Sequence, residues 1–335
     1  MFHKPLTGLL LAPLALLLTG CQKLTVLTPS GAVAAHERDL LVATFVLMLL
    51  VVVPLFVATI WVAIRYRHNN RKATYAPEWE NSTKLELLIW AGPLAIVVAI
   101  GAITWVGTHT LDPYRPLAQA DYQTHANTQI KPLEVDVVAL NWQWLFMYPQ
   151  YGIATVNQMA APVNRPIQFS ITASDVMNSF YIPALAGQIY AMPGMRTKLA
   201  AVINEAGNYT GISANYSGAG FSQMHFRFLG QSPADFKQWI EKVRAQGKTL
   251  NRENYLQLAQ PTINGPVTYY AHYAPKLFGA IVNRCVKPGK LCKSEIAAID
   301  KRESAAYERA GGSGIPMQMH TSQLPATPAF NEQQP

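Results

Sequence analysis

The sequence has few charged residues. Aspartate, glutamate, lysine and arginine make up 14% of its 335 residues, whereas 50% of the residues are hydrophobic. A soluble protein usually carries charge on about a quarter of its residues, so this shortage argues against a wholly soluble chain. The formal net charge is +8, yet no basic stripe is interleaved with aromatic residues, which argues against nucleic-acid binding. The positive excess instead indicates membrane orientation and contact with lipid.

Cysteine is scarce as well, with three residues in the whole chain. Cys21 follows a short basic start and an apolar run, and the small residues Thr19 and Gly20 directly precede it. This pattern is typical of a bacterial lipobox, in which a signal peptide of residues 1–20 is removed and the thiol of Cys21 takes up diacylglycerol. An ordinary signal peptide followed by a chance cysteine is the alternative.

Two apolar segments, residues 40–64 and 85–106, are long enough to cross a bilayer as helices. The loop between them, residues 65–84, carries five lysine and arginine residues against two glutamates. The positive-inside rule places this loop in the cytoplasm and both flanking segments in the periplasm, so we predict a bacterial inner-membrane protein. A lipidated Cys21 agrees with this topology, because lipoproteins are processed on the outer side of that membrane.

The segment that follows the second span changes to a period of two. Apolar and polar residues alternate in three short stretches, 133–137, 167–171 and 224–228. Such stretches, separated by turn-forming residues, predict half-buried strands, and we expect an all-β sandwich over residues 131–230. Ser232 and the proline after it are typical of a helix start, so a short helical C-terminal arm is expected over residues 231–300.

These patterns together divide the chain into consecutive segments. They are a signal peptide (1–20), a periplasmic N-terminal segment (21–39), transmembrane helix 1 (40–64), a cytoplasmic loop (65–84), transmembrane helix 2 (85–106), a linker (107–130), the β-domain (131–230), the helical arm (231–300) and a disordered tail (301–335). The tail is assigned mainly from the composition of residues 310–335, which are rich in Pro, Gln, Ser and Gly.

Cys285 and Cys292 lie close together in the predicted periplasmic arm. The periplasm is oxidising, so we expect these cysteines to form a disulfide. Closing so short a loop would stabilise the fold by roughly 2–3 kcal/mol in the chain-entropy model. A pair of free thiols is the alternative.

Several motifs of the β-domain occur together in one family. They are Asn141-Trp142-Gln143-Trp144 followed by Tyr148-Pro149, then residues 174–180 (Ser-Asp-Val-Met-Asn-Ser-Phe) and residues 191–195 (Ala-Met-Pro-Gly-Met). With the lipobox and the helical hairpin before them, these motifs resemble subunit II of the haem–copper oxidases over roughly residues 21–290. The resemblance implies a cupredoxin-like sandwich for the β-domain.

Members of that family that oxidise cytochrome c hold a dinuclear copper A centre, with the ligand spacing Cys-x3-Cys-x3-His-x2-Met and a further His on an earlier loop. The corresponding positions here are Ser213, Ser217, Phe221, Met224 and Asn178, and the backbone carbonyl ligand would fall at Asn215. A hydroxyl group cannot replace a bridging thiolate, and a phenyl ring offers no donor. We therefore expect no metal and no other cofactor on this chain, a pattern that resembles the quinol oxidases of the cytochrome bo type.

That resemblance implies a non-catalytic subunit of a proton-translocating ubiquinol oxidase in the aerobic respiratory chain. The complex would oxidise ubiquinol and reduce O₂ to water. Haems and copper would reside in subunit I, which this chain would brace together with other small membrane subunits. No catalytic residue is expected on the chain itself, and without copper the two tryptophans Trp142 and Trp144 are expected to serve packing.

Glu86 is the one residue for which the resemblance implies a role in proton transfer. In the family, a glutamate at this place in the second span stands at the mouth of a proton-uptake path, and carboxylates near a membrane are costly unless paired or hydrated. Thr83 and Glu86 also match a capping box, in which Glu86 would only cap the helix. Two further functions stay open, namely a copper A-bearing subunit of a cytochrome c oxidase and a stand-alone periplasmic lipoprotein that binds a partner.

Overall fold

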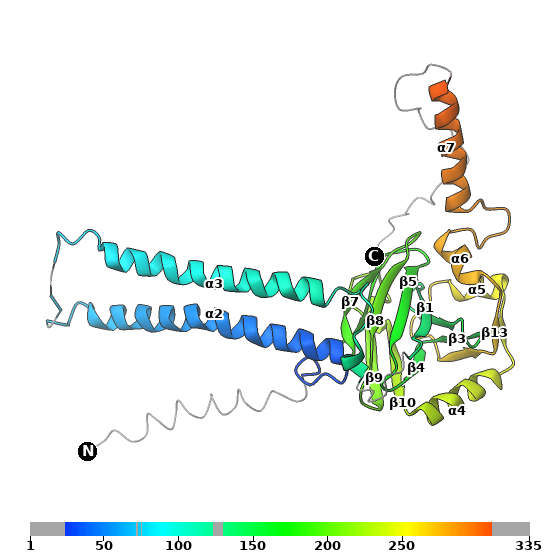
Figure 1. Cartoon of the computed structure of the whole chain (residues 1–335), viewed down its shortest axis with the longest axis horizontal. Coiled ribbons are helices and arrows are strands. Elements are labelled where there is room, and N and C mark those ends of the chain that lie inside the picture. Colours follow the sequence, from blue (N-terminus) through cyan, green and yellow to red (C-terminus); the bar gives the residue numbers. More distant parts are fainter. Residues whose placement is uncertain (1–23, 72, 75, 123–129, 310–335) are drawn as a thin grey trace, which may run out of the picture.

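The computed structural model describes residues 24–71, 73–74, 76–122 and 130–309. The predicted signal peptide, Cys21 and residues 310–335 of the predicted tail lie outside these ranges. A long helical hairpin projects from a β-domain, and small helices and strands of the C-terminal arm cover the side of that domain away from the hairpin (Figure 1).

The hairpin consists of α2 (Ala32–Arg65) and α3 (Thr83–Thr110), both long and apolar enough to cross a membrane. Each helix extends beyond the predicted apolar run because its polar end continues the helix as far as the β-domain. At that end Gly107 is buried, and a Cβ atom on it would lie 2.9 Å from Cδ1 of Leu40. The absence of a side chain at Gly107 therefore lets the two helices approach closely.

The β-domain is a sandwich of two sheets. The first sheet has the strand order β12-β3-β2-β1-β5-β8, and the second has the order β4-β10-β9-β6-β7. The strands of the first sheet are β1 (Leu133–Ala139), β2 (Trp144–Tyr148), β3 (Ile153–Val156), β5 (Ile167–Ala173), β8 (Thr197–Ala201) and β12 (Thr268–Tyr270). Those of the second are β4 (Gln158–Pro162), β6 (Asn178–Ile182), β7 (Ala186–Ala191), β9 (Gly207–Ser213) and β10 (His225–Gln231). The predicted strands coincide with β1, β5 and β10.

The period of two in the sequence decides which side chains enter the core. In β1, Val135 and Val137 point between the two sheets, whereas Val138 points to the opposite face. The space between the sheets is filled by an aromatic cluster with edge-on and stacked rings, and we call it the ring cluster. It consists of Trp144, Phe146, Phe169, Phe180 and Phe226.

The C-terminal arm is not purely helical, and the predicted boundary at residue 230 does not coincide with the end of the sheet. Its elements are α4 (Pro233–Arg244), β11 (Thr249–Leu250), α5 (Arg252–Leu258), β12, β13 (His272–Tyr273), α6 (Leu277–Val282) and α7 (Lys293–Arg309). Strand β12 pairs antiparallel with β3 and so completes the first sheet. Leu250, Leu277 and Ile281 pack with Val138 in a second hydrophobic cluster, so the arm and the sandwich share a core.

The prediction that the disordered tail begins at residue 301 is wrong for its first residues, because α7 continues to Arg309. Residues 293–309 are rich in Ala, Glu, Lys and Arg, which are strong helix formers. Glu295 lies in the first turn and Arg309 in the last, where their charges complement the helix dipole. The predicted boundary at residue 301 therefore falls inside a helix.

Candidate functional site

The positions that the resemblance matches to copper ligands lie at one end of the second sheet. Asn178 is the first residue of β6 and Ser213 is the last residue of β9, and these two strands pair antiparallel. The connection from β9 to β10 contains Ser217 and a short 3-10 helix, η2 (Phe221–Gln223), and it ends at Met224. The fold thus brings the five side-chain positions to the same end of the second sheet.

Hydrogen bonds between neutral groups occupy the centre of this loop. The hydroxyl of Ser213 lies 3.1 Å from Oδ1 of Asn178 and 3.3 Å from the carbonyl oxygen of Asn215, so it can donate to either. The amide of Asn178 donates to the carbonyl of Val176 at 3.1 Å. Asn178 and Ser213 are both buried, and buried polar groups need such partners. Their side chains therefore satisfy one another.

The other three positions supply no complete ligand set. Met224 is buried in the core, and the ring of Phe221 packs edge-on to Tyr216 with 5.7 Å between their centroids. The hydroxyl of Ser217 is buried and has no hydrogen-bond partner among the described residues. Within the same ranges, no three His, Cys, Asp or Glu residues lie close enough together to hold a metal ion.

Trp142 packs against one side of the connection from β9 to β10. Its indole Nε1 donates to the carbonyl of Ser217 at 2.9 Å, and a Cβ atom on Gly220 would lie 2.4 Å from the indole ring. Trp142 itself has a φ of 69°, a left-handed conformation that few non-glycine residues adopt. Trp144 is fully buried in the ring cluster. Both tryptophans therefore serve packing, as the sequence predicted.

Glu86 lies in the first turn of α3 with its side chain exposed. The capping box predicted with Thr83 is wrong, because the N-cap is Ser82 and no side chain caps the helix. The backbone of Ser82 is extended, so the helix begins at Thr83 and Glu86 is the fourth helical residue. A capping glutamate stands at the third position. In the part of the chain that the structure describes, the carboxylate of Glu86 makes no hydrogen bond or ion pair.

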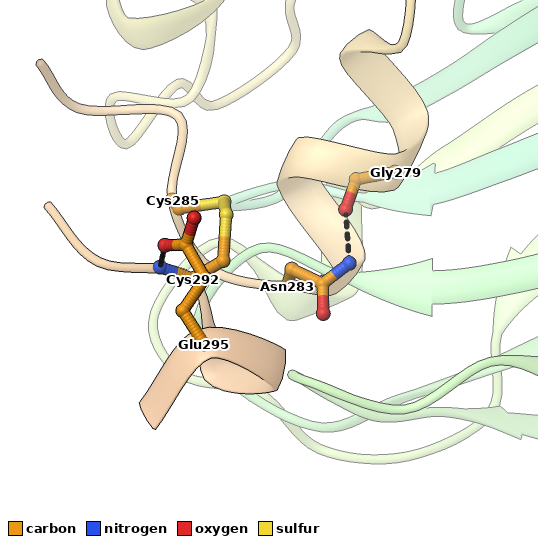
Figure 2. The surroundings of a disulfide bond; sticks show 5 residues. All are labelled: Gly279, Asn283, Cys285, Cys292 and Glu295. Carbon is orange, nitrogen blue, oxygen red and sulfur yellow. Dashed lines mark hydrogen bonds between the residues drawn. A yellow bond between two sulfur atoms is a disulfide. The ribbon is translucent and has the colours of Figure 1, made fainter. Parts of the chain in front are cut away.

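Cys285 and Cys292 form a disulfide with 4.7 Å between their Cα atoms. Figure 2 shows it between the end of α6 and the beginning of α7. Next to it, the backbone N–H of Cys292 donates to the carboxylate of Glu295 at 2.7 Å, and the amide of Asn283 donates to the carbonyl of Gly279 at 2.9 Å. The disulfide therefore links α7 to the rest of the C-terminal arm.

Comparison with known proteins places these features in one family. The family profile described as the periplasmic domain of cytochrome c oxidase subunit II matches residues 119–228, and an aromatic-rich motif of the same oxidases matches residues 244–289. The chain is 46% identical to cytochrome bo(3) ubiquinol oxidase subunit 2 of Pseudomonas putida, over 80% of this chain and 82% of that protein. It is also 46% identical to ubiquinol oxidase subunit 2 of Acetobacter aceti, over 87% of this chain and 92% of that protein.

The chain belongs to the subunit 2 family of ubiquinol oxidases. It is therefore a subunit of an oxidoreductase complex in the inner membrane, and its cupredoxin-like domain is periplasmic. Among solved structures, it is similar to the periplasmic domain of subunit II of the cytochrome oxidase of Bradyrhizobium japonicum. That similarity covers 34% of this chain and 94% of the other, with 22% identity and a TM-score of 0.33.

Sequence reasoning missed one polar contact of this ubiquinol oxidase subunit. Glu37, in the second turn of α2, accepts a hydrogen bond from the backbone N–H of Gly187 in β7 at 2.9 Å. This contact joins the hairpin to the domain. The only sign of it in the sequence is an acidic residue just before an apolar run, which does not indicate a partner 150 residues away.

Proposed function

We propose that this subunit is a non-catalytic element that braces the haem-bearing subunit I and takes no part in electron transfer. One observation supports the proposal above all, namely the hydrogen bond between Ser213 and Asn178 at the position of a copper centre. Ubiquinol would then deliver its electrons within the membrane to haems and copper of subunit I, where O₂ is reduced to water. Other small membrane subunits would complete the assembly.

The chemistry of the copper positions is the reason for this proposal. A dinuclear copper centre needs two bridging thiolates together with imidazole and thioether ligands, and soft ligands are what copper prefers. At the sites of the thiolates the chain has hydroxyl groups, and at the sites of the imidazoles it has an amide and a phenyl ring. Met224 alone offers a suitable donor, which is too little to hold the metal.

The test is the copper content of the purified oxidase complex, measured together with its haem content. We expect all copper to be accounted for by subunit I, with no near-infrared absorption of a mixed-valence copper pair. Ubiquinol should support oxygen consumption, whereas reduced cytochrome c should not. Two additional coppers per complex, together with oxidation of cytochrome c, would refute the proposal in favour of a cytochrome c oxidase.

We propose further that Glu86 takes up protons from the cytoplasm on behalf of subunit I. The support is its place at the cytoplasmic end of α3, where its exposed carboxylate has no partner among the described residues. A hydrated carboxylate at the membrane surface can exchange protons with bulk water, whereas one held in a cap would be less available. Because no side chain caps α3, the carboxylate of Glu86 is not held in a capping box, which supports its availability for proton exchange.

Replacing Glu86 with Gln is expected to reduce ubiquinol-driven oxygen consumption by roughly tenfold, which corresponds to about 1.4 kcal/mol in the barrier for proton uptake. Glu86→Asp should restore part of the rate, because it restores a titratable group. Glu80→Gln is the matched control, since Glu80 is an exposed carboxylate in the adjoining loop. Turnover and proton release are measured in proteoliposomes. Full activity of Glu86→Gln would show that this carboxylate is dispensable.

We also propose that the mature chain begins at Cys21 and carries diacylglycerol on its thiol. The lipobox before Cys21 supports this, and the two spans make lipidation secondary for anchoring. The intact mass of the purified subunit tests it. A mass that includes residues 1–20, or that lacks the acyl groups, would contradict the proposal.

A further inference from the structure

A cavity of about 1040 Å³ lies where the periplasmic ends of α2 and α3 meet the β-domain. Its floor is apolar and comes from both helices, mainly from Leu40, Ala43, Ala102, Ile103 and Val106. The rest of its lining comes from the helix ends, from the segment after α3 and from β7 and β8, and this part, which we call the rim, contains all of the charged residues of the cavity. The volume is at the upper end of the range for small-molecule sites, so the cavity can accept a sizeable ligand.

The floor of the cavity suits a hydrocarbon chain. Ala43 and Ala102 are small and exposed, and they lie in the membrane-spanning part of the hairpin. The close contact between Leu40 and Gly107 holds the two helices together beside them. An apolar cavity of this kind does not retain water well, because water finds no polar partners there. The natural occupant is therefore an apolar chain from the bilayer.

The rim carries an excess of negative charge. Its acidic residues are Glu37, Asp39, Asp112 and Asp121, and its basic or titratable residues are Arg115 and His36. Asp39 is paired with Arg38 at 2.6 Å, which is the only ion pair among the described residues. Glu37 is half-buried and accepts one hydrogen bond from the backbone N–H of Gly187, but it forms no ion pair within the described ranges. A ligand with a positively charged group would complement Glu37.

The depth of the rim matches the headgroup region of the outer leaflet. Trp105 is 70% exposed near the periplasmic end of α3, where interfacial tryptophans are found in membrane proteins. Nη1 of Arg115 donates to the carbonyl of His109 at 3.3 Å, so the guanidinium lies just beyond that tryptophan. A guanidinium at this level is well suited to a phosphate group.

We propose that this cavity binds one phospholipid of the periplasmic leaflet whose headgroup carries an ammonium, such as phosphatidylethanolamine. The ammonium lies toward Glu37 and the phosphate toward Arg115, while one acyl chain follows Ala43 and Ala102. The net negative charge of the rim disfavours phosphatidylglycerol, which has a phosphate and no compensating cation. The lipid fills the space between the hairpin and the domain and so fixes their relative orientation.

The experiment uses the whole oxidase complex, exchanged into an equal mixture of phosphatidylethanolamine and phosphatidylglycerol and then examined by native mass spectrometry. Ala43→Trp fills the floor of the cavity. Ala58→Trp is the matched control, since Ala58 is exposed on the same helix but does not line the cavity. We expect the wild type and Ala58→Trp to retain one more phosphatidylethanolamine per complex than Ala43→Trp, at equal haem content.

Glu37→Gln tests recognition of the lipid headgroup independently of the acyl-chain site. If Ala43→Trp impairs assembly of the complex, Glu37→Gln still tests the proposal. Its side-chain carbonyl can still accept from Gly187, while the negative charge is lost. We expect this variant to lose its preference for phosphatidylethanolamine over phosphatidylglycerol. Equal lipid retention in wild type and Ala43→Trp, or retention of phosphatidylglycerol by the wild type, would overturn the proposal. So would a structure of the complex in which a segment of another subunit fills the cavity.

Discussion

A fourfold substitution, Asn178→His, Ser213→Cys, Ser217→Cys and Phe221→His, is expected to give this subunit about two bound copper ions. The fold already brings two of these positions together, since the hydroxyl of Ser213 lies 3.1 Å from Oδ1 of Asn178. Met224 and the carbonyl of Asn215 would complete the ligand set. The change with the lowest cost is Ser217→Cys, because the buried hydroxyl of Ser217 has no partner to lose among the described residues.

Metal analysis and near-infrared absorption of the purified complex measure this gain. The matched control contains the other three substitutions but keeps Ser217, so that only one of the two bridging thiolates is present. We expect the control to lack the absorption of a mixed-valence pair. If the fourfold variant bound no copper, or if the control bound as much, the loop would no longer have the geometry of a copper site.

Phe180→Ala is expected to destabilise the β-domain by about 3–5 kcal/mol, the usual cost of removing a buried phenyl ring. Phe180 is fully buried at the centre of the ring cluster and stacks on Phe226 with 5.4 Å between their centroids. It also packs against Trp144 and Phe169, so the cavity left by the substitution would be surrounded by rigid rings. These neighbours have little freedom to close the space.

The measurement is the thermal unfolding midpoint of the subunit within the complex, followed by protease susceptibility. For a domain of this size, we expect a decrease of roughly 10 °C. Tyr216→Ala is the control, because Tyr216 is 76% exposed and its removal should change stability by less than about 0.5 kcal/mol. If both variants unfolded at the same temperature, the ring cluster would not be the main source of stability in this domain.

The part of the fold that depends on local patterns could be predicted from the sequence. Alternation located β1, β5 and β10. Ser232 and Pro233 predicted the start of α4, where the hydroxyl of Ser232 accepts a hydrogen bond from the backbone N–H of Asp235. The part that depends on distant partners could not. Strand β12 is only three residues long and is defined by its pairing with β3, far earlier in the chain. No local pattern in so short a segment indicates such a partner.

The candidate site shows the same limit. The spacing of Ser213, Ser217 and Phe221 predicted that they belong to one loop, and the structure places them between the end of β9 and the start of η2. That Ser213 and Asn178 would hydrogen-bond to each other depends on the pairing of β6 with β9, which the sequence does not specify. The predicted capping box at Thr83 is wrong because the N-cap is Ser82, one residue earlier than the prediction requires. This shift puts Glu86 at the fourth helical position, where it cannot complete the box.

The pairing of β4 has a consequence for biogenesis. In its sheet, β4 has a single neighbour, β10, and the two strands run parallel. Because β10 is the last strand of that sheet in the sequence, β4 reaches the periplasm long before its partner does. A chain halted during translocation before His225, where β10 begins, would therefore present an open strand edge, which is prone to aggregation and to attack by quality-control proteases.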